Sequence, residues 1–329
     1  MKIVKAFRHI EWWEYKLPPL LGIAYATLLF NNQNIFNQGL YILLALISLI
    51  AGAVYVSIIN DIADIKDDAA AGKQNRMEKL PLFAKLLLPG ICLLTGLFFI
   101  IFLYWPDYLS CLFYSIPWIA FSMYSFKPIR LKNRGILGVL ADASGAHIFT
   151  SLLMVSYMCF RTNQQVNTTW ICLIGIWAAC YGMRGILWHQ FHDRENDIRA
   201  HIETFATKRN PQKFNNIEFI ILSVEVSALL CILFLLNNFL VYAGFVLYLL
   251  VVFVRYRKLH RMPVIIIAPE RPHQILLQDF AQVFFPVSIL MYAAFTQPDG
   301  WIVLLIHLLL FPFRTLQVIK DLKNGLLGH

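Results

Sequence analysis

Four aspartates and an asparagine stand close together after the second apolar stretch of the chain. The segment reads Asn60-Asp61-Ile62-Ala63-Asp64-Ile65-Lys66-Asp67-Asp68. If a helix runs through it, Asn60, Asp61, Asp64 and Asp68 share one face, because residues three and four apart are neighbours on a helix. Clustered carboxylate oxygens suit a hard cation such as Mg²⁺, which usually binds through one or two carboxylates and substrate phosphates.

A second acidic segment, Asp193-Arg194-Glu195-Asn196-Asp197, follows the sixth apolar stretch. Its two aspartates are one helical turn apart. If both carboxylate faces lie at the same depth, two Mg²⁺ ions held between them could clamp a diphosphate and stabilise it as a leaving group. Each motif taken alone is also compatible with a solvated loop that is merely acidic. Taken together, the motifs predict the metal ligands Asp61, Asp64, Asp68, Asp193 and Asp197, of which Asp64, Asp68, Asp193 and Asp197 are predicted to be catalytic.

A basic segment, Tyr124–Gly135, follows the fourth apolar stretch. Arginine binds phosphate oxygens in bidentate fashion and lysine binds them as a point charge. Basic loops are the default on one side of any membrane protein, so this assignment depends on the diphosphate that the acidic motifs imply. The predicted diphosphate-binding residues are Asn60, Arg76, Lys127, Arg130 and Lys132.

The motifs lie at the ends of stretches that are long and apolar enough to cross a bilayer. The chain has 329 residues, of which 59% are hydrophobic and 14% charged, whereas soluble domains carry about 25% charged residues. A crossing helix needs roughly 20 mostly apolar residues. The sequence predicts ten, at 17–33, 39–59, 82–104, 108–125, 136–158, 169–189, 216–236, 238–254, 279–296 and 300–316.

We therefore predict an all-α fold: a polytopic transmembrane bundle of nine or ten spans around a central cavity. The whole chain, 1–329, is expected to form a single integral membrane domain. The motifs are expected on loops at 60–81, 126–135 and 191–215.

The distribution of basic residues predicts the orientation. With the N-terminus inside, 25 of the 28 lysines and arginines fall in segments on the inner side, as the positive-inside rule requires. The net charge of +9 is thereby explained by the bilayer, and no nucleic-acid partner is needed. The N-terminus and both acidic motifs are predicted on the cytoplasmic side, in the cell membrane.

These segments resemble the UbiA superfamily of intramembrane prenyltransferases, whose members carry N-D-x-x-D-x-x-x-D after the second span and D-x-x-x-D after the sixth. Asn60, Asp61, Asp64 and Asp68 fill the fixed places of the first motif, and Asp193 and Asp197 those of the second. The likeness covers roughly residues 10–255. It implies about nine helices around a central cavity, Mg²⁺ as cofactor, a prenyl diphosphate at the cytoplasmic side and an apolar tunnel for the prenyl chain.

Two segments depart from the family pattern. The His-Pro and Arg-Pro pairs that are common after the first motif are replaced by Gly72-Lys73-Gln74-Asn75-Arg76-Met77, and the Tyr-Asp pair upstream of the second motif is absent from Arg184–His192. Both changes fall where the acceptor and the diphosphate are usually handled, so the acceptor stays open.

The sequence thus predicts Mg²⁺-dependent ionisation of an allylic diphosphate and prenyl transfer to a hydrophobic acceptor, aromatic or lipid. Alternatives on the same fold are a terpene cyclase and transfer of a sugar phosphate onto a polyprenyl phosphate. A transporter is an alternative of another class, with Glu225 and His147 as membrane-embedded ionisable groups. Glu225 could face the cavity or pair with another helix, and Asp142 could join the polar site.

Overall fold

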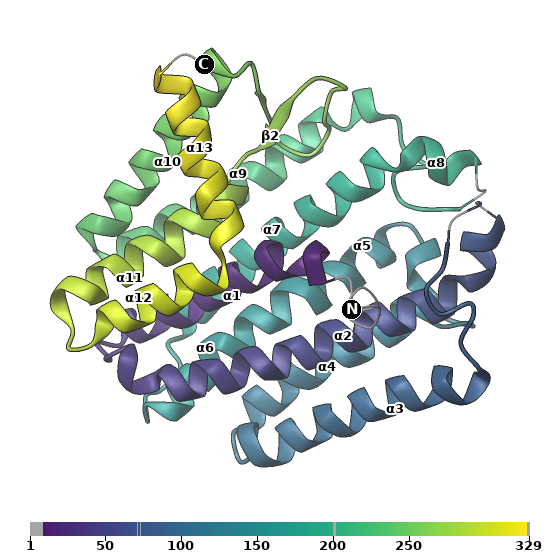
Figure 1. Cartoon of the computed structure of the whole chain (residues 1–329), viewed down its shortest axis with the longest axis horizontal. Helices are drawn as coiled ribbons and strands as arrows, with labels where there is room; N and C mark the ends of the chain where they lie inside the picture. The colour runs from purple at the N-terminus through teal and green to yellow at the C-terminus, as the bar shows by residue number, and fades with distance from the viewer. Residues whose placement is uncertain (1–8, 71, 73, 200–201, 328–329) are drawn as a thin grey trace.

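The computed structural model describes residues 9–70, 72, 74–199 and 202–327. Long helices run side by side through the molecule, and both aspartate motifs lie toward the same end of it (Figure 1). The α-helices are α1 His9–Phe30, α2 Gly39–Ala70, α3 Leu82–Phe99, α4 Tyr108–Ser125, α5 Ile136–Ala143, α6 Phe149–Arg161, α7 Thr168–His192, α8 Arg194–Arg199, α9 Asn215–Leu236, α10 Phe239–Lys258, α11 Phe285–Thr296, α12 Gly300–Leu310 and α13 Pro312–Leu327.

Short irregular elements complete the fold. π-Helical turns extend or join the helices: η3 Ile100–Tyr104, η5 Ser144–Ile148 and η7 Phe280–Phe284. Short 3₁₀ turns lie in connections: η2 Phe36–Gln38, η4 Leu131–Asn133 and η6 Pro211–Lys213. After α10 the chain forms a small parallel pair of strands, β1 Met262–Val264 and β2 His273–Ile275, with Met262 opposite His273.

The first nine predicted stretches are helical, and the predicted bounds 108–125 are those of α4. The tenth, 300–316, is wrong as one straight span, because α12 and α13 meet at 85°. Pro312 explains the break: its ring disfavours helical geometry at the residue before it, and Phe311 has φ −129° and ψ 60°. The predicted loop 60–81 also needs correction, since α2 continues to Ala70 and the connection starts only there.

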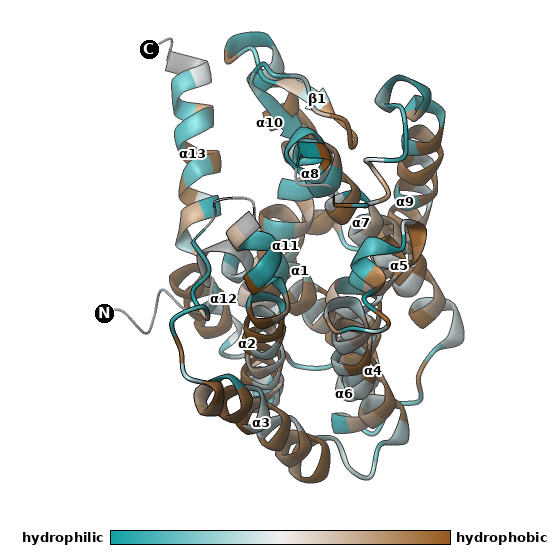
Figure 2. Ribbon diagram, turned by 90° about the vertical axis from the view of Figure 1, so that its right-hand side faces the viewer, coloured by the Kyte–Doolittle hydropathy of each residue, from teal (hydrophilic) through white to brown (hydrophobic). Residues whose placement is uncertain are grey.

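Six helices are long and apolar enough to cross a bilayer, or seven if the bent pair counts as one span, within the residues that the structure describes. They are 36–69, 82–104, 136–161, 168–192, 215–236 and 239–258. The chain is therefore an all-α polytopic membrane protein. Polar residues gather at the end that carries α8, β1 and the end of α13, while α3 is apolar along its outer face (Figure 2).

Candidate active site

The first aspartate motif lies on continuous helix, in the last three turns of α2. Its asparagine meets the neighbouring helix at once: the Ser125 hydroxyl, at the end of α4, donates a hydrogen bond to Asn60 Oδ1. Asp61, one residue on, is buried, with 3% of its surface exposed. The predicted shared face therefore points into the protein rather than into a loop.

The basic segment closes over this face. The Arg130 guanidinium donates to Asp64 Oδ1 at 3.0 Å and to Asp67 Oδ2 at 2.5 Å, and the Lys132 ammonium is ion-paired with Asp64. Arg130 is buried and takes a left-handed backbone conformation, with φ 41°. Lys127 is exposed and, in the part of the chain that the structure describes, makes no hydrogen bond or ion pair with the motif.

Asn75 holds the far end of the motif, and the sequence reading did not identify it. Its Nδ2 donates to Asp68 Oδ2 at 2.7 Å and to the Asp61 carbonyl at 2.8 Å, while its Oδ1 accepts from the Met77 amide at 2.8 Å. Asn75 stands in the segment that departs from the family pattern, and this departure is the sequence feature that could have identified it. The next residue, Arg76, is exposed.

The second motif begins where α7 ends. Asp193 is the C-cap of α7 and is exposed, and Asp197 lies one turn on in α8. The Thr204 hydroxyl contacts Asp197 Oδ2 at 3.5 Å. The chain that follows is tied back to α7, because the Phe205 amide donates to the buried Gln190 side chain at 3.1 Å.

The two motifs approach the same tyrosine. The Tyr124 phenol, in the last turn of α4, lies within electrostatic range of Asp64 and Asp197, and also of Asp142 on α5. Among the residues that the structure describes, no three His, Cys, Asp or Glu side chains converge tightly enough to hold a metal ion by themselves. Such an open set of carboxylate oxygens fits Mg²⁺, which takes one or two carboxylates and completes its shell with phosphate oxygens and water.

An apolar cavity of about 210 Å³ leads away from the first motif. Asn60 forms part of its wall, so the polar site and the cavity are continuous. Aromatic side chains of α4 line it, namely Tyr114, Trp118 and Phe121. Lys16 of α1 and His189 of α7 are also in the wall, so the cavity has a few polar groups in a mostly apolar lining.

Glu225 does not face this cavity. It forms a fully buried ion pair with Arg184, joining α9 to α7, with Arg184 Nη2 2.9 Å from Glu225 Oε1. Arg184 also donates to the carbonyls of Ile265 at 3.2 Å and Leu276 at 2.8 Å. Of the two alternatives that the sequence left open, Glu225 therefore pairs with another helix and does not face the cavity. This pairing removes the reason to regard Glu225 as an ion-coupling residue of a transporter.

The fold and the site define a helical membrane protein with two aspartate motifs at one end and an apolar cavity beside the first. The model of the UbiA prenyltransferase family matches residues 17–263, and the chain belongs to this family. Comparison with curated proteins gives no match.

Solved structures with the same fold include a UbiA homolog from Archaeoglobus fulgidus bound to GPP and Mg²⁺. It is 14% identical with a TM-score of 0.57, over 92% of this chain and 99% of that one. The DMAPP and Mg²⁺ complex of the same homolog gives 14% identity and a TM-score of 0.53 over the same shares. Its Cd²⁺ complex gives 13% and 0.52, over 98% of both chains.

Proposed function

We propose that this protein is an intramembrane prenyltransferase, which ionises a prenyl diphosphate with Mg²⁺ and passes the prenyl group to an acceptor. The observation that carries the proposal is the position of Asn60. It begins the aspartate motif and also lines the apolar cavity, so a molecule with a diphosphate head and an apolar tail would fit across the boundary. The GPP, DMAPP and Mg²⁺ bound by the Archaeoglobus fulgidus homolog support the same substrate class.

The diphosphate would lie at the end of α2. Mg²⁺, when bound, would neutralise the phosphate oxygens and make diphosphate a better leaving group. Its proposed ligands are Asp61, Asp64, Asp68, Asp193 and Asp197. Arg130 and Lys132 lie against Asp64 and so are placed to contact phosphate oxygens of a diphosphate bound there. Arg76, Lys127 and Asn60 remain proposed diphosphate contacts.

The cavity would hold the prenyl chain and protect the reaction. As the allylic carbon–oxygen bond breaks, positive charge develops on the allylic carbon, and the faces of Trp118, Tyr114 and Phe121 can stabilise it. The apolar wall keeps water from capturing this carbon. The Asn60 amide, which accepts a hydrogen bond from Ser125, would lie beside the allylic carbon–oxygen bond that breaks. We place this site on the cytoplasmic side.

The test is Mg²⁺-dependent diphosphate release from a panel of prenyl diphosphates by the purified full-length protein. Asp64→Ala and Asp193→Ala should each lower the rate at least about 100-fold, while thermal unfolding stays cooperative. The matched control is Asp299→Asn. Asp299 is an exposed aspartate with φ 58°, a conformation that asparagine adopts readily.

Product analysis separates the other reactions of this fold. A cyclic hydrocarbon formed without any acceptor would replace the proposal by a cyclase. A product carrying a sugar phosphate on a polyprenyl phosphate would identify that transfer instead. Substrate uptake into liposomes with no diphosphate release would indicate a transporter.

A further inference from the structure

A second cavity, of about 580 Å³, lies beside the apolar one. Lys16 and His189 are in the walls of both, so the two meet at these side chains. Its remaining walls come from α1, α5, η5, α7, α10, α13, the connection at Arg261 and the segment 273–282. All of that segment and all of α13 lie beyond the stretch that matches the family model, 17–263. We call this space the polar chamber.

Basic side chains dominate the wall of the polar chamber. Its lysine and arginines are Lys16, Arg184, Arg255, Arg261 and Arg314, against two carboxylates, Asp142 and Asp279. Two further carboxylates pair with these arginines but do not line the chamber themselves. Glu225 pairs with Arg184, and Asp321 pairs with Arg255 and Arg261. Five cations thus face four carboxylates.

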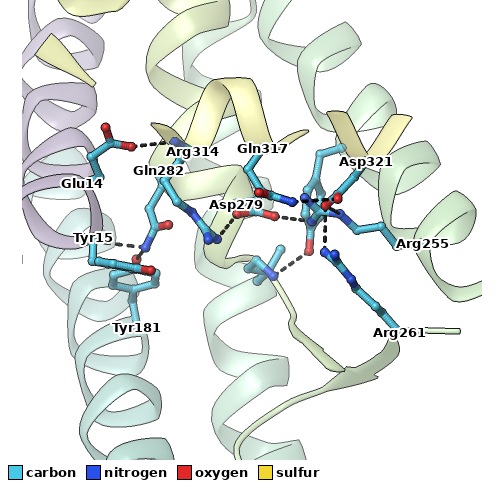
Figure 3. A network of polar contacts seen from close by, with 12 residues as sticks. Glu14, Tyr15, Tyr181, Arg255, Arg261, Asp279, Gln282, Arg314, Gln317 and Asp321 are labelled. Atoms are coloured by element: carbon cyan, nitrogen blue, oxygen red, sulfur yellow. Dashed lines mark hydrogen bonds and ion pairs between the residues drawn. The ribbon is translucent and has the colours of Figure 1, made fainter. Parts of the chain in front are cut away.

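Most of these charges hold the wall together. Asp279 is shared by Arg255 and Arg314, and Asp321 accepts from Arg261 Nη1 at 2.7 Å and from Gln317 at 2.8 Å (Figure 3). Glu14 is used elsewhere, because its carboxylate accepts from the first amides of α13. In the part of the chain that the structure describes, Lys16 and Asp142 make no hydrogen bond or ion pair, so one cation and one carboxylate remain available to a ligand.

Neutral polar groups in the wall also retain bonding capacity. Gln282 is 3% exposed, and its Nε2 donates to the Tyr15 carbonyl at 3.2 Å and the Tyr181 hydroxyl at 3.3 Å (Figure 3). Its Oε1 has no partner among the described residues, and neither has Trp188 Nε1, Gln274 Oε1 or Arg314 Nε.

Buried polar atoms left unpaired are costly, and native structures have few. Here donors and acceptors are left over together on one wall. A hydroxyl group both donates and accepts, so a ligand with several hydroxyls would satisfy both kinds.

We propose that the polar chamber binds the prenyl acceptor, and that this acceptor is a polyhydroxylated compound carrying an anionic group, of the sugar phosphate class. The proposal rests on the proposed prenyl transfer. The arginine wall would take the anionic group, since Arg261 and Arg314 keep 33% and 26% of their side chains exposed. The reacting hydroxyl would lie where the chamber meets the apolar cavity, beside Lys16.

The proposed transfer breaks one bond and forms another. The bond between the allylic carbon and the diphosphate oxygen breaks, and the diphosphate leaves with both electrons. A new carbon–oxygen bond joins the prenyl carbon to the acceptor hydroxyl. Its proton passes to the Asp142 carboxylate, which lines the chamber. The acceptor proposed here is polar and anionic, whereas the sequence predicts a hydrophobic one.

The test is direct binding to the full-length protein in detergent, measured by calorimetry with and without geranyl diphosphate and Mg²⁺. The probes are ribose 5-phosphate, ribose, inorganic phosphate and 4-methylphenol. Ribose 5-phosphate should bind at least about 10-fold more tightly than each of the other three. Tighter binding of 4-methylphenol, or equal binding of inorganic phosphate, would overturn the proposed class of acceptor.

Two substitutions locate the binding in the chamber. Gln282→Leu and Trp188→Phe should each weaken ribose 5-phosphate binding about 10-fold and leave geranyl diphosphate binding unchanged. The matched control is Gln38→Leu, because Gln38 Oε1 is also buried without a partner among the described residues but stands in η2, before α2. If all three variants bound ribose 5-phosphate equally well, the polar chamber would not be the binding site. Geranyl diphosphate binding is measured separately. If geranyl diphosphate did not bind while ribose 5-phosphate did, the result would count against prenyl transfer and not against the chamber as a binding site.

Discussion

Asp64 is the residue on which the charges of the site converge. It accepts from Arg130 at 3.0 Å and is paired with Lys132, although both basic residues are far from Asp64 in sequence. Helical spacing predicts the face that Asp64 shares with Asn60 and Asp68, and the predicted set omits Asp67, although Asp67 stands only three residues after Asp64. The structure gives Asp67 its own role, since it binds the same guanidinium as Asp64.

Arg130→Lys should raise the KM for the prenyl diphosphate about 10-fold with a smaller effect on kcat. Arg130 Nη2 alone donates to both Asp64 and Asp67, which leaves the rest of the planar guanidinium fork for phosphate oxygens, and a lysine ammonium has no such fork. Steady-state diphosphate release measures both constants. The control is Arg134→Lys, because Arg134 is exposed on the same segment and its side chain donates to the Pro128 carbonyl. An unchanged KM in Arg130→Lys would remove Arg130 from the proposed diphosphate contacts.

Glu225→Gln should destabilise the protein by about 3–5 kcal/mol, the usual cost of leaving one partner of a buried ion pair uncompensated. Arg184 would keep its charge, and among the described residues its other acceptors are the carbonyls of Ile265 and Leu276. Thermal unfolding in detergent measures the loss. The double variant Arg184→Met/Glu225→Leu should recover much of it, since no charge then stays buried alone. Equal destabilisation by both would contradict this account.

At the scale of elements, the close approach of η4 to α5 positions the basic segment. A Cβ on Gly138 would lie 2.7 Å from the Leu131 carbonyl oxygen and 3.1 Å from Lys132 Cα. Both neighbours are backbone, so neither can move as a flexible side chain would. The glycine therefore lets the turn that carries Lys132 pack directly on the helix.

Gly138→Ala should push this turn outward and lower kcat/KM for the prenyl diphosphate about 10-fold or more. The matched control is Gly90→Ala in α3, where a Cβ would meet nothing within 4 Å, and where alanine favours helix by up to about 1 kcal/mol. Kinetics of both variants, with thermal unfolding as a check on folding, provide the measurement. Equal activity in the two would show that the turn tolerates displacement.

The elements themselves were largely predictable, because apolar length and periodicity are local properties of the sequence. The helix at 108–125 follows from its composition, whereas the first motif was expected on a loop and lies on α2. Contacts between distant segments were not predictable in this way. Asn75 folding back on Asp68, Arg184 meeting Glu225, and Arg255 and Arg314 sharing Asp279 all depend on how helices pack. The bend at Phe311 was missed, although Pro312 signals it.

At the scale of the whole molecule, charge and apolar surface are separated along the bundle. Large apolar side chains of α3 and of η3, which extends it, are exposed, for example Leu94, Phe98 and Phe102 at 70%, 53% and 72%. Such surface is stable only against lipid, since a soluble protein rarely exposes so large a patch. The polar end carries both aspartate motifs, in the last turns of α2 and at the start of α8. By our proposals, one face of the membrane would then supply both the diphosphate and the acceptor.

The positive-inside rule predicts that this polar end faces the cytoplasm. Lys208 lies on the connection after the second motif and Gln164 on the turn between α6 and α7, and both are exposed. In a background with the six native cysteines changed to alanine, Gln164→Cys should react with a membrane-impermeant maleimide in intact cells. Lys208→Cys should react only after the membrane is opened. Labelling of Lys208→Cys in intact cells would place the active site outside, and the substrates would then have to come from that side.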